Sequence, residues 1–175
     1  RDYIRFAASA WWTWRFQQDG FIRPSLFFST RLEETFQAKS WGTGLRWLFP
    51  SMGGWGRFVT NGTVNIVVDP ISTGNPLFSR GGESGLRGLV FQSLQGNNIL
   101  QTNLEYRSPS LRVFRTRLGF AAFHDMGATF QLGDLPEPQH SVGVGLRLLF
   151  LSTNRDVIRV DYGIPVGGLR SGFQY

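Results

Sequence analysis

Residues 141–150, SVGVGLRLLF, carry an apolar side chain at every even position and mainly serine, glycine or arginine at the odd positions. Successive side chains of a β-strand point to opposite faces of its sheet, so an alternation with a period of two is typical of a strand with one apolar face. A helix would instead repeat its apolar positions at intervals of three and four residues. This stretch therefore predicts a β-strand.

The same alternation recurs on both sides of this stretch, and clusters of glycine, proline and small polar residues separate the alternating segments. No segment has a helical period, so the sequence predicts an all-β protein of about eight strands, with a ninth starting at Ser171. The alternating segments are 6–16, 41–49, 63–69, 100–107, 115–125 and 157–164, and the breaks are 18–20, 50–56, 69–82, 95–97, 133–139 and 153–156.

The composition indicates that the apolar faces meet lipid. Phenylalanine, tryptophan and tyrosine make up 15% of the 175 residues, and Lys39 is the only lysine among 18 basic residues. A soluble sheet usually has many lysines and glutamates on its solvent face, whereas a membrane barrel has an apolar, aromatic-flanked outside and a polar lumen. We predict an antiparallel transmembrane β-barrel; a soluble antiparallel barrel or sandwich is the open alternative.

The alternation also predicts which side chains share a face. One set should face the lumen and the other should face lipid, because a slip of one residue would invert every face. The lumen set is Arg46, Glu105, Arg107, Arg115, Asp125, Arg147 and Arg159, and the lipid set is Leu104, Leu118, Leu146 and Val160.

A glycine-rich segment, RGGESGLRG at 80–88, follows a long predicted loop. No helix follows it, so it lacks the helix N-terminus of a nucleotide-binding fingerprint. Alone it indicates only a flexible turn, but four further segments follow it in a set order. They are NLEYR at 103–107, FHDMG at 123–127, GVGLR at 143–147 and RVDYG at 159–163.

In this order the segments resemble the bacterial surface antigen family, the barrels of the outer membrane protein 85 superfamily. BamA-like assembly factors, TamA-like translocation factors and two-partner secretion pores belong there. The resemblance covers residues 77–175 by motif and 3–70 by strand pattern. In the family, a Val-Arg-Gly-Phe-type tetrad lies at the tip of the sixth extracellular loop, which folds back into the lumen. LRGL at 86–89 matches this tetrad at Arg-Gly and departs at the fourth position, where an aromatic residue is usual, and FHDMG matches the Phe-x-Asp-x-Gly strand motif completely.

The resemblance implies that residues 69–89 form an inward-folded loop. Arg87 inside a lumen needs anionic partners, since an unpaired desolvated guanidinium is costly, and parity places Glu105 and Asp125 on the inward face. In the alternative, Arg87 points to water and Asp125 pairs with Arg115 or Arg117. The loop-pinning residues expected are Arg87, Gly88, Glu105, Phe123, Asp125 and Gly127.

For the whole chain, the resemblance implies the C-terminal half of a bacterial outer-membrane barrel, with about eight or nine strands of about 16. The barrel domain spans residues 1–175, and the closing strand is cut short at Tyr175. The expected function is to help outer-membrane proteins insert or other proteins cross this membrane. Expected partners are lipid, a client β-barrel or secreted polypeptide, and periplasmic accessory proteins. The alternatives are a passive pore and the barrel anchor of a secreted enzyme domain outside this chain.

Other chemistry finds little support in the sequence. The chain has no cysteine and only two histidines, His124 and His140, one of which is expected in a loop. A thiolate metal site is therefore excluded, and a histidine-based triad or metal site is not expected. The net charge of +6 shows no basic cluster or nucleic-acid motif. We expect no enzyme activity, no cofactor, no metal and no nucleic-acid partner.

Overall fold

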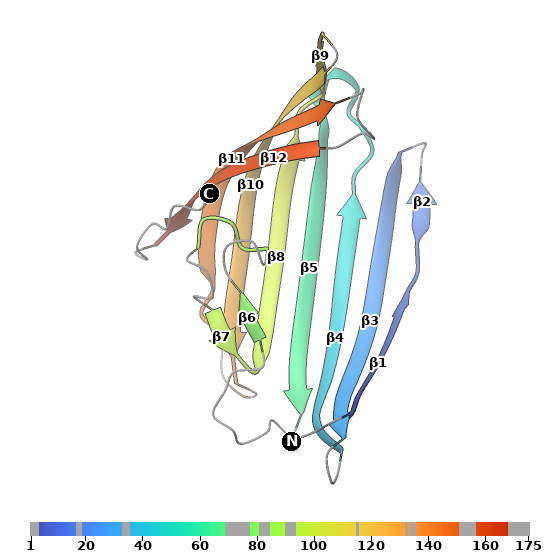
Figure 1. The fold of residues 1–175 in the computed structure, drawn as a ribbon, viewed down its shortest axis with the longest axis vertical. Helices are drawn as coiled ribbons and strands as arrows, with labels where there is room; N and C mark the ends of the chain where they lie inside the picture. Colours follow the sequence, from blue (N-terminus) through green and yellow to red (C-terminus); the bar gives the residue numbers. More distant parts are fainter. Residues whose placement is uncertain are drawn as a thin grey trace.

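The computed structural model describes residues 4–16, 19–32, 36–68, 78–80, 85–89, 94–114, 116–131, 133, 136–150 and 157–167. The protein is all-β, and its ten-stranded sheet is antiparallel throughout (Figure 1). The strands of this sheet are β1 (Ile4–Trp11), β2 (Trp14–Phe16), β3 (Gly20–Leu32), β4 (Phe36–Leu48), β5 (Arg57–Val68), β8 (Asn98–Arg107), β9 (Leu111–Val113), β10 (Thr116–Phe130), β11 (Gln139–Phe150) and β12 (Val157–Val166).

The long strands lie side by side in the order in which they occur in the sequence, β1-β3-β4-β5-β8-β10-β11-β12. The short β2 pairs with β3, and β9 pairs with β10. Within the described residues, β1 and β12 each have one neighbour, so the sheet is open. The part of the chain that the structure describes also contains a two-stranded sheet and one 3-10 turn, η1 (Gly53–Trp55), and no described helix is long and apolar enough to cross a membrane.

The two faces of the sheet differ in chemistry. Asn61, Asn103, Asp125 and Ser141 face one another across β5, β8, β10 and β11, and direct cross-strand partners share a face. We call the face that carries these four residues the inner face and the opposite one the outer face. The two-stranded sheet of β6 (Phe78–Arg80) and β7 (Leu94–Gly96) lies on the inner side, where Gly96 abuts Thr129 of β10 (Figure 1).

The inner face is polar and largely covered, whereas the outer face is apolar and exposed. Leu26 and Val144 of the outer face are 65% and 60% exposed, while Asp125 and Ser141 of the inner face are fully buried. Further exposed apolar side chains of the outer face are Phe6, Trp41, Leu45, Leu104, Phe120, Val142, Ile158, Val160, Tyr162 and Ile164.

The predicted division between two faces is confirmed. Arg46, Glu105, Arg107, Asp125, Arg147 and Arg159 lie on the inner face, and Leu104, Leu118, Leu146 and Val160 lie on the outer face. Arg115, the ninth strand expected at Ser171 and residues 69–77 and 81–84 of the expected loop lie outside the described residues. No second sheet covers the outer face within the described part of the chain.

Three details of the predicted strands are wrong, and one of them is that β6 (Phe78–Arg80) lies inside the break predicted at 69–82. The first alternating segment is interrupted at Trp12 and Thr13, between β1 and β2, although both strands pair with β3 in one register. Pro24 of β3 lies opposite this gap. The Trp12 N–H donates to the Pro24 carbonyl at 3.1 Å, but proline has no N–H, so the second hydrogen bond of the pair cannot form. The break predicted at 95–97 is also displaced, because Gln95 and Gly96 belong to β7.

Candidate functional site: the docked arginine

The site is built around residues 85–89, which lie against the inner face of β8, β10, β11 and β12 (Figure 1). Leu86 and Leu89 of this segment are almost fully buried and pack with Leu94 in one apolar cluster. Gly127 of β10 lies beneath the cluster, and a Cβ at Gly127 would come within 2.7 Å of Leu94 Cδ1. Burial of these leucines holds the segment on the sheet.

Gly88 seats the segment on β12. Its φ of +81° is in the left-handed region that favours glycine. A Cβ at Gly88 would lie 2.7 Å from the carbonyl carbon of Gly163 and 2.8 Å from the amide nitrogen of Ile164. Both the backbone angle and the close approach therefore require glycine at position 88.

Arg87 makes a forked contact with Asp125. Its Nε and Nη2 donate to the two carboxylate oxygens, at 2.8 and 2.9 Å, and its backbone N–H donates to Oδ2 at 3.0 Å. Asp125 is fully buried, so this contact compensates a carboxylate that has lost its water. Paired, charge-assisted bonds of this kind fix direction as well as distance.

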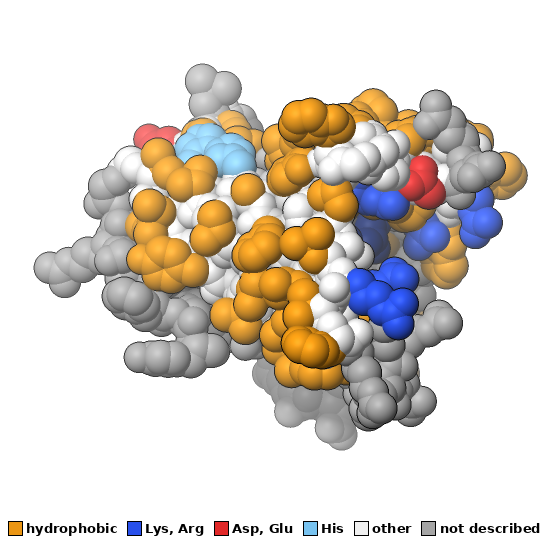
Figure 2. Space-filling view, turned by 90° about the horizontal axis from the view of Figure 1, so that it is seen from above, with side chains coloured by type: hydrophobic (Ala, Val, Ile, Leu, Met, Phe, Trp, Pro, Cys, Tyr) orange, Lys and Arg blue, Asp and Glu red, His pale blue; other side chains and the backbone are white. Residues whose placement is uncertain are grey.

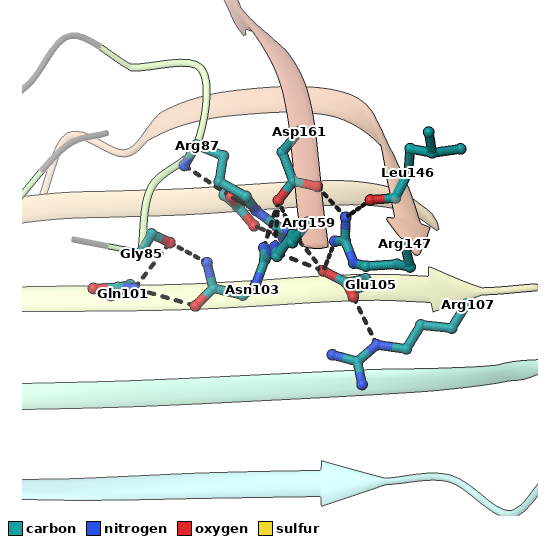
Figure 3. A network of polar contacts seen from close by, with 11 residues as sticks. Gly85, Arg87, Gln101, Asn103, Glu105, Arg107, Leu146, Arg147, Arg159 and Asp161 are labelled. Atoms are coloured by element: carbon teal, nitrogen blue, oxygen red, sulfur yellow. Dashed lines mark hydrogen bonds and ion pairs between the residues drawn. The ribbon is translucent and has the colours of Figure 1, made fainter. Parts of the chain in front are cut away.

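Glu105 and Asp161 complete the anionic surroundings of Arg87 (Figure 3). Arg87 Nη1 donates to Glu105 and lies 3.4 Å from Asp161 Oδ2. Arg147 Nη1 bonds Asp161 at 2.5 Å, and Arg107 Nε bonds Glu105 Oε1 at 2.7 Å. Arg159 is 2.5 Å from Asp161 through its Nη2. Four guanidinium groups and three carboxylates thus form one network across β8, β10, β11, β12 and the docked segment.

Two further inner-face residues contact Arg87. Its guanidinium carbon lies 3.6 Å from the centre of the Phe123 ring, in cation–π contact. Ser141 Oγ donates to the Arg87 carbonyl. Nearby, Gln101 Nε2 donates to the Gly85 carbonyl at 3.0 Å, and Asn103 donates to the same oxygen (Figure 3).

The electrostatics keep Arg87 charged. Burial alone would lower the pKa of Arg87, but hydrogen bonds and charge from Asp125 and Glu105 raise this pKa above its usual range. Each charged group of the network is held in at least one ion pair. The arrangement is suited to fixing a loop inside a polar space.

All six residues expected to pin the loop meet in this site. The alternative pairing of Asp125 with Arg117 is absent, since Arg117 lies at the other end of β10 and Asp125 binds Arg87. Sequence reasoning missed the contacts of Ser141, Asp161 and Gly163. Their inward parity was visible, but only the strand register brings β11 and β12 to the same position as β10.

The histidines differ from expectation. β11 begins at Gln139, so His140 lies in a strand and not in a loop. His124 Nε2 and His140 Nδ1 are 3.2 Å apart on the outer face. Within the described residues no cluster of three or more histidine or acidic side chains could hold a metal ion.

No protein-family model matches the sequence, and searches of curated proteins and of solved structures find no significant match.

Proposed function

We propose that this chain is a membrane-spanning part of a bacterial outer-membrane β-barrel that helps other proteins insert into, or cross, that membrane. The single observation that carries the membrane part is the inversion of the two faces. Exposed apolar side chains cover the outer face, and the buried polar residues line the inner one. A protein surrounded by water would favour the reverse arrangement.

Strand length and pairing support this proposal. β3 and β4 have 13 residues each and β10 has 15. A tilted strand needs about 9–11 residues to cross the hydrocarbon core. Neighbouring strands pair along these lengths, as lipid requires of backbone polar groups. That the sheet closes into a barrel, and the number of strands in that barrel, are parts of this proposal.

The docked arginine supports the assembly or translocation role within this class. Arg87 and Asp125 stand in the two motifs that resemble the bacterial surface antigen family, and the two side chains form a bidentate pair.

The test uses the full-length protein reconstituted in lipid vesicles with an unfolded β-barrel client. The rate at which the client becomes protected from added protease should exceed the rate with empty vesicles. Arg87→Ala should remove most of this excess, while Arg112→Ala, which changes an exposed arginine of β9, should keep it. Ion conductance with no acceleration of the client would instead establish a passive pore.

A further inference from the structure

A second group of arginines lies on the inner face, away from the docked segment. Arg23 of β3 directly faces Arg46 of β4, and Arg15 of β2 directly faces Phe21 of β3. Phe21 and Arg23 are two residues apart in one strand, so all four side chains share a face. The row continues from Arg46 through Asn61, which identifies this face as the inner one. We call Arg15, Arg23 and Arg46 the arginine triad.

The arginine triad has no compensating carboxylate among the described residues. Arg23 Nε donates to Thr13 Oγ1 at 2.9 Å, and this bond is neutral on the acceptor side. The guanidinium carbons of Arg23 and Arg46 lie 5.3 and 5.9 Å from the centre of the Phe21 ring. In contrast, Arg107, Arg147 and Arg159 all have acidic partners.

Asp19, the acid between β2 and β3, is already paired with another cation. Asp19 Oδ2 is 2.9 Å from Arg57 Nη2, and the Asp19 carboxylate also accepts from the Ser51 N–H at 3.2 Å. Figure 2 views the molecule from above relative to Figure 1, and basic side chains gather on one side of this view. The inner face of β2, β3 and β4 therefore carries positive charge that no described carboxylate offsets.

The geometry favours an extended chain with acidic residues. Like charges directly opposite on neighbouring strands are destabilising, so a bound anion would relieve the Arg23–Arg46 pair. Direct partners lie about 5 Å apart and diagonal ones about 7–8 Å, and alternate side chains of an extended peptide are about 7 Å apart. Carboxylates also match the fork of a guanidinium.

We propose that the arginine triad binds an extended acidic segment of a polypeptide, with carboxylates at alternate positions, on the inner face of the sheet. This inference rests on the proposed function in one respect: the outer face contacts lipid, so lipid headgroups do not reach the triad. The Phe21 ring supplies the apolar floor on which the guanidinium groups of Arg23 and Arg46 rest.

The experiment measures binding of a fluorescent peptide of alternating glutamate and serine to the full-length protein in detergent micelles, by anisotropy. The peptide should bind, and its glutamine counterpart should not. The double change Arg23→Gln and Arg46→Gln should weaken binding by about tenfold or more, since charge-assisted bonds are lost. Arg112→Gln removes the same kind of charge from β9 and should leave affinity within about twofold, because β5, β8 and β10 separate β9 from the strands of the triad.

Three results would overturn the proposal: equal losses in the double variant and in Arg112→Gln, displacement of the peptide by inorganic phosphate at matched ionic strength, or displacement by anionic lipid added to the micelles. If the double variant fails to fold, Arg46→Gln alone serves, because Arg46 forms no ion pair within the described residues and its loss leaves no carboxylate unpaired. The proposed function has its own test: it would fail if the protein did not accelerate insertion of the client in the vesicle assay, whatever the result of the peptide-binding experiment.

Discussion

Replacing Arg87 by alanine should release residues 85–89 from the inner face while the sheet stays folded. The change removes both bonds of the fork to Asp125, the bond to Glu105 and the stacking on Phe123. These contacts act as a unit, so their separate energies should not be summed. Removing one partner of a buried ion pair costs about 3–5 kcal/mol, because the other charge is left buried alone.

A cysteine at position 141 can report this release, because the chain has no cysteine of its own. Ser141 is fully buried and donates to the Arg87 carbonyl, so a thiol at this position is accessible only when the segment leaves. Its labelling rate by a small hydrophilic reagent then follows the undocked fraction. A loss of 3–5 kcal/mol corresponds to an increase of about 10²-fold to 4 × 10³-fold, limited by the rate of a fully exposed thiol.

The matched control is Arg112→Ala in the same Ser141→Cys background, and it should label at the original rate. Asp125→Asn should give a smaller increase than Arg87→Ala, since a neutral acceptor of the same shape remains. An increase of less than about threefold for Arg87→Ala, well under one decade, would refute the reasoning, as would an equal increase for Arg112→Ala.

Three further changes test other contacts with the same reporter or with the folded sheet. Gly163→Ala should also raise labelling, because its Cβ would lie 2.9 Å from Gly88 Cα, whereas at Gly119 the nearest atom is 3.9 Å away and Gly119→Ala should not raise it. Phe123→Leu should weaken docking by about 0.5–2 kcal/mol through loss of the cation–π contact, so an unchanged labelling rate would remove Phe123 from the site. Val160→Arg, on the outer face, should destabilise the membrane-inserted protein by about 2–4 kcal/mol in denaturant titration if Val160 lies near the bilayer midplane; a change within about 0.5 kcal/mol, typical of a water-exposed surface, would argue against lipid there.

Strand parity was enough to predict the two faces of the sheet, but not the contact of Arg87 with Asp125. Parity follows from the period of two, which the sequence displays directly in segments such as 141–150. The contact itself needed the motif resemblance, because parity places Glu105 and Asp125 on a face without placing a loop against it. The structure brings the loop there through Leu86, Leu89 and Gly88.

What the sequence could not show depends on register and on single backbone groups. The part played by Asp161 requires its alignment with Gly145 of β11, which is a property of strand pairing. The interruption at Trp12 follows from the missing N–H of Pro24 on the neighbouring strand, which a pattern within one strand does not reveal. The arginine triad was hidden for the same reason, since its members belong to three strands.

The central claim is that the outer face contacts lipid and the inner face contacts water. Spin labels attached to single cysteines at positions 102–106 of β8, in the full-length protein reconstituted in lipid bilayers, test it most directly. Positions 102, 104 and 106 lie on the outer face, and positions 103 and 105 lie on the inner face. Collisions with oxygen, which dissolves in lipid, should be frequent at the even positions, and collisions with a water-soluble nickel complex should be rare there. The odd positions should show no such preference for oxygen. The claim would be contradicted if the nickel complex reached positions 102, 104 and 106 as readily as positions 103 and 105, or if positions 102, 104 and 106 were protected from both reagents.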